Sequence, residues 1–280
     1  MKKITCLSLL LGLAAAGATS ASAQTTTAAP ATTPAPAAAP APVADAAPSS
    51  SWTVTPAFAS QYMFRGVRLD GPSFEPTIEY DNGNLAVGVW SNFPLKDKVE
   101  GQSDPEFDFY GSYKQELIKD TLYFVPGYTI YTYPNAHKEN GFYKLTAEPN
   151  VAINYTVAGV TLTPKLYYDF VLKGATWEFT GAYTVPLKDA NTELDFTGTY
   201  GTYLWTDAIP DVDPGVKNWG NYYLVGVSMP FTIGKNGKLT VGFAYTKGSS
   251  NFYKQGSDPK VANGAAVGRG VVTIGYGITF

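Results

Sequence analysis

The sequence predicts an all-β protein, a transmembrane antiparallel up-and-down β-barrel of about twelve strands over residues 51–280. Apolar and polar residues alternate through most of this stretch, as expected of strands with one apolar and one polar face. Short and long connections alternate between the expected strands, as they do when short turns gather at one end of a barrel. The chain also ends on such a strand, with the aromatic residue Phe280 in the last position.

The first 23 residues have the organisation of a secretory signal peptide. A cationic start is followed by an apolar stretch from Leu7 to Ala16, and then by the small residues Ala21–Ala23. The apolar stretch is too short to span a bilayer as a helix. Cys6 is the only cysteine and lies before the apolar stretch, so we expect an exported chain that contains no disulfide.

Residues 24–50 are predicted to form a disordered spacer. They are almost entirely Ala, Pro and Thr, a composition that cannot bury a core and favours extended conformations. Two interpretations remain open for this segment: a periplasmic tether that holds the barrel away from another structure, or a tail with no partner.

The twelve expected strands follow from the alternation alone. The first is expected to place Trp52, Tyr62 and Phe64 on the apolar face, with Arg65 on the polar face. The expected strands are Trp52 to Phe64, Phe74 to Tyr80, Leu85 to Val89, Phe107 to Tyr113, Leu122 to Ile130, Tyr143 to Ile153, Val160 to Phe170, Trp177 to Val185, Leu194 to Leu204, Tyr223 to Met229, Leu239 to Tyr245, and Val272 to Phe280.

The connections separate into two groups. The short turns are expected at 81–84, 119–120, 158–159, 188–191 and 235–237, and several contain Asn-Gly or Ala-Gly turn chemistry. The long connections are expected at 66–72, 94–104, 134–141, 206–218 and 247–268. With about twelve strands, both ends of the barrel domain fall on the side of the short turns.

Five prolines lie inside the expected strands, in the register of the apolar face. Proline cannot donate to a sheet ladder and is uncommon in central strands. We therefore expect these residues at bulges or at misplaced strand boundaries: Pro56, Pro76, Pro126, Pro149 and Pro164.

The apolar face is predicted to contact lipid rather than a protein core. Many of the strands run to ten or more residues, which suits a tilted membrane crossing. The face is rich in aromatic residues, which make up 14% of the chain, and packing them inside a closed barrel would be difficult. The alternative is a soluble β-sandwich that ends on an ordinary strand.

Two segments resemble a known family. Residues 58–67 contain Ser60, Tyr62, Phe64, Arg65 and Gly66, which match the Ser-x-Tyr-x-Phe-Arg-Gly signature in the opening strand of the TorF-like porins of Gram-negative bacteria. Residues 85–92 are similar to the glycine- and tryptophan-containing strand that follows in that family. The resemblance implies an outer-membrane barrel and, at most, a pore.

The last strand resembles the assembly signal of bacterial outer-membrane barrels. Tyr276, Ile278 and Phe280 lie on its apolar face and form this predicted signal, which implies the barrel-assembly machinery as a partner. The resemblance implies an outer-membrane location, and with both ends of the barrel on the short-turn side we expect the spacer to lie in the periplasm. Its other expected partners are outer-membrane lipid and small solutes.

The polar faces together form a predicted lumen wall on which ten acids outnumber four bases. Ionised groups are costly toward lipid, so we expect them to face inward. Arg65 is expected to pair with Glu75 across the first hairpin. The predicted lumen-lining residues are Arg65, Glu75, Glu79, Glu106, Asp108, Lys114, Glu116, Lys144, Glu148, Lys165, Asp169, Glu178, Glu193 and Asp195.

This wall has two interpretations. The first is a water-filled channel for passive diffusion of small solutes, with a preference for cationic or neutral ones. The second is a plugged lumen, in which opposite charges pair across the interior and the barrel serves as an anchor or displays its loops. Twelve strands lie between small filled barrels and large open porins, so the strand number does not decide between them.

The sequence does not indicate an enzyme. The single histidine, His137, lies in an expected loop, whereas a nucleophile and base need rigid strands. Asp207, Asp211 and Asp213 are close enough in sequence to bind calcium, but the prolines and glycine among them favour ordinary turn chemistry. We therefore expect no cofactor and no metal. The formal charge of −3 does not suggest nucleic acid as a partner.

Overall fold

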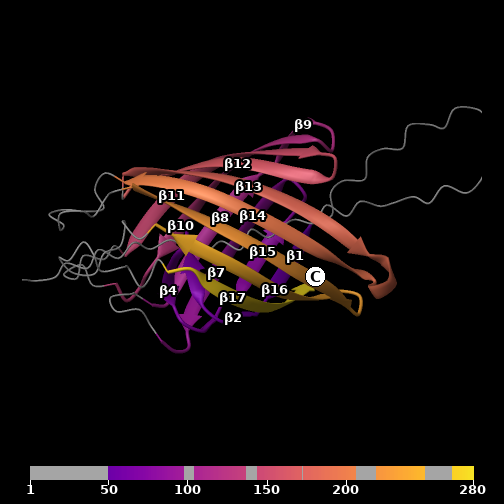
Figure 1. Ribbon diagram of the computed structural model, residues 1–280, viewed down its shortest axis with the longest axis horizontal. Coiled ribbons are helices and arrows are strands. Elements are labelled where there is room, and N and C mark those ends of the chain that lie inside the picture. The colour runs from indigo at the N-terminus through magenta and orange to yellow at the C-terminus, as the bar shows by residue number, and fades with distance from the viewer. Residues whose placement is uncertain (1–49, 98–103, 137–143, 172, 206–218, 250–266) are drawn as a thin grey trace, which may run out of the picture.

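The computed structural model describes residues 50–97, 104–136, 144–171, 173–205, 219–249 and 267–280. Over these residues the chain forms a closed antiparallel barrel of twelve strands, as the alternation predicted. Figure 1 shows the barrel from the side, with its strands inclined to its long axis. The expected signal peptide and the spacer up to residue 49 lie outside the described residues.

The first, second and fourth barrel strands are each formed by two shorter segments. They are β1 (Ser51–Thr55) with β2 (Ala57–Ala59), β5 (Ser73–Phe74) with β6 (Thr77–Asp81), and β8 (Glu106–Tyr113) with β9 (Gln115–Ile118). The continuous barrel strands are β7 (Leu85–Pro94), β10 (Leu122–Thr132), β11 (Leu145–Val157), β12 (Val160–Asp169), β13 (Gly174–Leu187), β14 (Thr192–Trp205), β15 (Trp219–Ile233), β16 (Gly237–Gly248) and β17 (Arg269–Thr279).

The barrel closes where its last strand meets its first. Thr53 pairs with Thr279 between β1 and β17, and Phe58 pairs with Ile274 between β2 and β17. Beyond these pairs, the amide of Phe280 donates to the carbonyl of Trp52 at 2.8 Å. Closure gives each strand two neighbours. The backbone groups can then form hydrogen bonds between strands, which lipid cannot provide.

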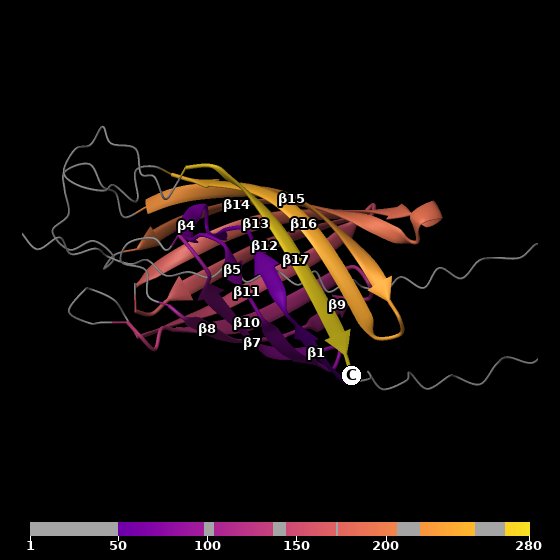
Figure 2. The same ribbon diagram turned by 90° about the horizontal axis from the view of Figure 1, so that it is seen from below.

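The two ends of the barrel differ. Five short turns connect β6 to β7, β9 to β10, β11 to β12, β13 to β14, and β15 to β16, and we name this the turn end. The other end, which we name the loop end, carries the connections 95–105, 133–144, 206–218 and 249–268. The start of β1 and the end of β17 both lie at the turn end, as expected (Figure 2).

The prolines behave in two ways. Pro56 lies between β1 and β2, and Pro76 lies just before β6, so these two mark interruptions of a barrel strand. Pro126 and Pro149 lie within continuous strands, paired with Val151 and Tyr128 respectively. In the β11–β12 ladder, Pro164 and its neighbour Thr163 have no paired residue in β11. The backbone N–H groups that proline lacks therefore interrupt the strand pairing only locally.

The outer face is apolar and rich in aromatic rings. Trp52, Trp177, Phe179 and Tyr200 are each at least half exposed, on the side away from the lumen. A face of this kind has no partner within the described chain and suits contact with lipid. No helix among the described residues is long and apolar enough to cross a membrane.

One segment departs from the predicted barrel. The first strand was expected to continue to Phe64, followed by a loop to Pro72. Instead the strand ends at Ala59, and the next residues form a separate hairpin of β3 (Tyr62–Phe64) and β4 (Val67–Asp70). Tyr62 and Phe64 are 1% and 6% exposed, so the prediction that they face lipid is wrong. Their rings face the inside of the barrel.

Candidate functional site

The β3–β4 hairpin reverses direction at Arg65 and Gly66. Both residues have positive φ, +43° and +77°, and Phe64 pairs with Val67 across the turn. These are the features of a two-residue type I′ turn, in which both central positions need the left-handed region. Glycine adopts it freely, whereas arginine does so at a cost of about 1 kcal/mol or more. Arg65 therefore needs compensating contacts elsewhere.

The tip of the hairpin contacts the barrel wall through two glycines. A Cβ added at Gly66 would lie 2.3 Å from the amide nitrogen of Gly248 in β16, and one added at Gly248 would lie 2.9 Å from the carbonyl oxygen of Gly66. Neither residue can carry a side chain without moving the backbone of the other. The backbone of the turn is therefore in direct contact with the backbone of β16.

Arg65 is held by the opposite wall. Its two terminal nitrogens donate to the two carboxylate oxygens of Glu148 in β11, at 3.0 and 2.9 Å. The hydroxyl of Tyr131 donates to the same carboxylate at 2.9 Å. The guanidinium also lies 4.6 Å from the ring centre of Phe64 and 4.7 Å from that of Tyr167. A bidentate pair between two aromatic rings is a strong setting for a buried arginine.

Tyr62 connects the hairpin to a second buried carboxylate. Its hydroxyl donates to Glu106 in β8 at 3.0 Å, and the hydroxyl of Tyr133 donates to the other oxygen of Glu106 at 2.8 Å. The ring of Tyr62 packs at 5.4 Å from the indole of Trp90. Tyr62 lies outside the barrel strands, and burial, with the nearby Glu106 carboxylate, raises the pKa of its phenol well above the ordinary value. The phenol therefore stays protonated and serves as a donor.

The return strand of the hairpin is fixed to β7. The side-chain amide of Asn92 donates to Asp70 at 3.1 Å, and both residues are buried. The nearby Ser73 hydroxyl donates to Glu75 at 2.7 Å. The hairpin thus touches the wall at β7, β8, β11, β12 and β16, which lie around the barrel. It spans the lumen rather than lining one side of it.

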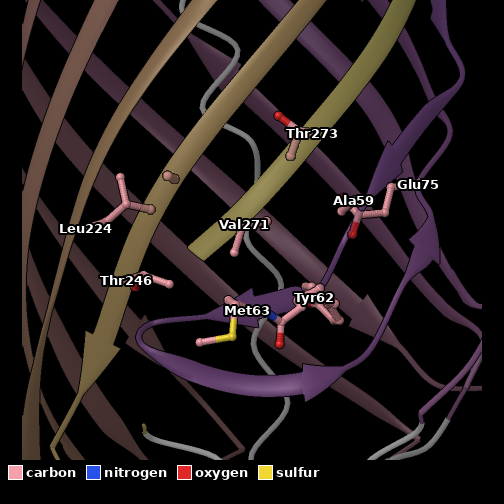
Figure 3. Close-up of a pocket in the computed structure, with 10 residues that line it drawn as sticks. Ala59, Tyr62, Met63, Glu75, Leu224, Thr246, Val271 and Thr273 are labelled. Carbon is pink, nitrogen blue, oxygen red and sulfur yellow. The ribbon is translucent and has the colours of Figure 1, made fainter. Parts of the chain in front are cut away.

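A cavity of about 50 Å³ remains between the hairpin and the strands β15 to β17. Figure 3 shows Tyr62 and Met63 of the hairpin beside Val271, Leu224 and Thr246 of the wall. The space is of the size of one or two water molecules.

The wall near the loop end is also filled by tyrosines laid over glycines. A Cβ on Gly201 would collide with the ring of Tyr222, and one on Gly220 would collide with the ring of Tyr203. The two residues of each pair face each other across β14 and β15, and the tyrosine rings stack at 6.2 Å. The missing side chains let the rings lie flat on the inner wall.

The predicted lumen-lining residues fall into three groups by exposure. The buried ones are Arg65, Glu106, Asp108, Glu148 and Asp169. The half-buried ones are Glu75, Glu79, Lys165, Glu178, Glu193 and Asp195. The exposed ones are Lys114, Glu116 and Lys144.

Several of these residues have partners other than the hairpin. Glu79 accepts from the hydroxyl of Tyr110 at 2.8 Å, and Asp195 accepts from Thr184 at 2.7 Å. The ammonium of Lys165 lies 4.5 Å from the ring centre of Tyr167, whose ring therefore meets two cations.

The turn-side half of the wall has a different composition. Beside larger or charged residues such as Tyr110, Glu79 and Asp195, it contains many threonines: Thr53, Thr55, Thr156, Thr161, Thr163, Thr180, Thr184, Thr197, Thr199 and Thr240. Their hydroxyls bond across neighbouring strands, as between Thr156 and Thr161 at 3.0 Å and between Thr180 and Thr199 at 2.9 Å. Short side chains of this kind leave space in a twelve-stranded barrel.

One predicted contact is wrong. Arg65 was expected to pair with Glu75 as its neighbour across the first hairpin. Because the hairpin folds inward, Arg65 reaches Glu148 on the far wall, and Glu75 bonds to Ser73 instead. His137 and the three aspartates Asp207, Asp211 and Asp213 lie outside the described residues. Within the described chain, no group of three or more His, Cys, Asp or Glu side chains could hold a metal ion.

The tyrosines that complete this site are not predicted from the sequence. They are Tyr131, Tyr133 and Tyr167, and none of them was given a role. Their signal in the sequence was weak, because tyrosine is as common on a lipid-facing wall as in a lumen. A better signal existed for the hairpin. Arg65-Gly66, between two short alternating stretches, fits a two-residue hairpin.

The family model described as "Bacterial protein of unknown function (Gcw_chp)" matches residues 45–173. This segment, somewhat less than half of the chain, contains the hairpin together with Glu106 and Glu148. No curated protein matches the chain significantly.

Two solved structures share the fold over almost their whole length. The KdgM porin aligns with a TM-score of 0.52 at 11% identity, covering 81% of this chain and 99% of that one. The NanC porin aligns with a TM-score of 0.50 at 11% identity, covering 81% and 98%. The chain has the fold of these porins. The more specific resemblance to TorF-like porins is not confirmed.

Proposed function

We propose that the protein is an outer-membrane channel for passive diffusion of small solutes, with a preference for cationic or neutral ones. The observation that supports this proposal most is that the inner wall differs between the two ends of the barrel. The turn-side half carries many threonines, whereas the loop-side half is crossed by the β3–β4 hairpin. In this proposal the hairpin forms the constriction of the channel.

The preference for cations rests on the charges at the constriction. Glu106, Asp108 and Glu148 are all buried there, and Arg65 pairs with only one of them. An excess of acids over bases at a constriction favours cations over anions in a confined passage.

The proposed location follows from the outer face and the two ends. Exposed aromatic and aliphatic side chains surround the barrel, which makes outer-membrane lipid the natural neighbour. We place the turn end in the periplasm and the loop end outside the cell. Residue 50 precedes β1 at the turn end, so the spacer would join the barrel on the periplasmic side.

The test is the reversal potential of purified protein in a planar bilayer with a salt gradient. We expect the current to be cation-selective. The preference for cations should decrease as the salt concentration rises, because salt screens the charges of the wall. The double variant Glu106→Gln with Asp108→Asn should keep the barrel folded and reduce the cation preference. A reversal potential of anionic sign would contradict the assignment of the wall.

The second candidate function is a non-conducting barrel that anchors the envelope or displays its loops. The observation in its favour is the depth of the hairpin, in which Tyr62, Met63 and Asp70 are at most 2% exposed. No current from correctly folded wild-type protein, under conditions where a known porin conducts, would favour this function over the channel.

A further inference from the structure

The guanidinium of Arg65 occupies a site built almost entirely by the barrel wall. Glu148 comes from β11, Tyr131 from β10 and Tyr167 from β12, three adjacent strands. We name these three residues the guanidinium site. The hairpin itself adds only the ring of Phe64. The site therefore does not depend on the hairpin for its position.

The geometry of this site distinguishes a guanidinium from other cations. Both oxygens of Glu148 accept from different nitrogens of Arg65, at 3.0 and 2.9 Å, which requires a planar fork. The hydroxyl of Tyr131 donates at 2.9 Å to one of these oxygens and so fixes the carboxylate. The ring of Tyr167, 4.7 Å away, offers a face on which a flat cation stacks. An ammonium can lie over the Tyr167 ring, as that of Lys165 does at 4.5 Å, but it lacks the planar fork that engages both oxygens of Glu148.

The occupant of the site is attached by a separable element. β3 and β4 pair with each other in a two-stranded sheet of their own and add no strand to the barrel ladder. Arg65 also sits at φ +43°, a conformation unfavourable for arginine. Its side chain can therefore leave the site without breaking a hydrogen bond between barrel strands.

An empty site would favour the uptake of another cation. Glu148 is 1% exposed, and without Arg65 it loses its bidentate partner and keeps only the hydroxyl of Tyr131 and the charge of nearby Lys165. A solute that brings the same group as Arg65 restores both hydrogen bonds and the stacking contact.

We infer that Glu148, Tyr131 and Tyr167 form a recognition site for guanidinium-bearing solutes, and that Arg65 is an internal occupant which such a solute displaces. The inference rests on the channel function proposed above, because a solute reaches this depth of the lumen only through an open passage. It adds the class of solute that the constriction recognises.

The binding test uses Arg65→Ala in the full barrel, titrated calorimetrically with methylguanidinium chloride or methylammonium chloride. We expect methylguanidinium to bind at least tenfold more tightly than methylammonium. This preference should disappear when Glu148→Gln is added. Arg68→Ala is the matched control. Arg68 lies on the same hairpin and donates to the carbonyl of Asp97, outside the guanidinium site. Arg68→Ala should bind methylguanidinium as weakly as the wild type does, because in both proteins the solute must compete with Arg65.

A second variant covers a failure of Arg65→Ala to fold. Ala59 and Ser73 pair directly across β2 and β5, so an Asn-Gly turn can replace residues 61–71 and leave the site empty. This variant should show the same preference for methylguanidinium. Equal binding of the two ions, in whichever variant folds, would overturn the inference.

The conductance test uses the wild-type channel. Methylguanidinium should raise its conductance at least twofold over the same concentration of methylammonium, because it displaces the side chain of Arg65 from the constriction. Equal conductance in the two ions would overturn the inference that the solute displaces Arg65. Selective binding without current in wild type and variants alike would support the site and contradict the channel. The failure of one proposal is therefore distinguishable from the failure of the other.

Discussion

The two halves of the lumen are built from the same alternating strands but hold different side chains. Near the turn end the inner wall carries threonines that bond to one another across the ladder, as Thr180 does to Thr199. Near the loop end it carries buried carboxylates and tyrosines that bond to the hairpin, as Glu106 does to Tyr62. The strands give the barrel its shape in both halves. Only the loop-side half contains groups that fix a second element inside it.

This difference shows how acidic residues of the wall can hold a second element. A carboxylate in contact with water costs little free energy, whereas a buried carboxylate needs hydrogen-bond donors. Glu106 receives two tyrosine hydroxyls, and Glu148 receives an arginine and a tyrosine. The donors at both carboxylates include a residue of the hairpin, so removing the hairpin should affect this half and spare the other.

The largest effect is expected from Gly66→Val. A Cβ there would meet the backbone of Gly248 at 2.3 Å, and valine is strongly disfavoured at φ +77°. We expect docking of the hairpin to lose about 3 kcal/mol or more. Trypsin should then cleave at Arg65, which is 5% exposed when docked. Gly198→Val is the control, because nothing lies within 4 Å of a Cβ at that position. Protection from trypsin in Gly66→Val would contradict the docking described here.

The next effect is expected from Glu148→Ala. It leaves Arg65 buried without its carboxylate, and breaking one side of a buried pair costs about 3–5 kcal/mol. Chemical denaturation followed by tryptophan fluorescence should show the hairpin region unfolding earlier than in the wild type, because Trp90 packs on Tyr62. Asp189→Ala, at an exposed turn, should change stability by less than about 0.5 kcal/mol. Equal stability of the two variants would show that the pair does not hold the hairpin.

A smaller effect on the folded barrel is expected from deletion of Phe280. Its backbone bonds to Trp52 in both directions at the seam, which the deletion removes. We predict impaired assembly in the outer membrane with intact export, as expected of an assembly signal formed by Tyr276, Ile278 and Phe280. Cell fractionation and heat-modifiable gel mobility measure this. Wild-type amounts of heat-modifiable barrel would count against the signal.

The smallest effect is expected from removal of residues 24–50. This stretch has no apolar periodicity, so it should contribute no core to either half. The purified truncated barrel should unfold within a few degrees of the full chain. A large loss of thermal stability would mean that the segment packs inside the barrel or against it.

The sequence predicted the barrel because a period of two is easy to detect when one face meets lipid. Strands such as β8, where Phe107 and Phe109 alternate with Glu106 and Asp108, have one physically consistent arrangement. The alternation failed from Tyr62 to Asp70, where both faces of the hairpin are buried inside the lumen. Rings that face a filled interior and rings that face lipid follow the same pattern.

The charged residues of the site were assigned to the inner wall from the sequence, but neither their contacts nor the tyrosines around them were predicted. Glu106, Glu148 and Arg65 were all assigned to the inner wall, yet Arg65 was paired with its neighbour in sequence rather than with Glu148. Local pairing is the simplest assumption when a hairpin stays in the sheet. A contact across the lumen depends on the whole barrel closing around the hairpin, which no local pattern encodes.

The most direct test of the central claim is the conductance of a barrel without the hairpin. In this variant, an Asn-Gly turn replaces residues 61–71 between the paired ends at Ala59 and Ser73. If the hairpin is the constriction, single-channel conductance in planar bilayers should rise severalfold over the wild type, with heat-modifiable mobility retained. A conductance equal to that of the wild type would contradict the account.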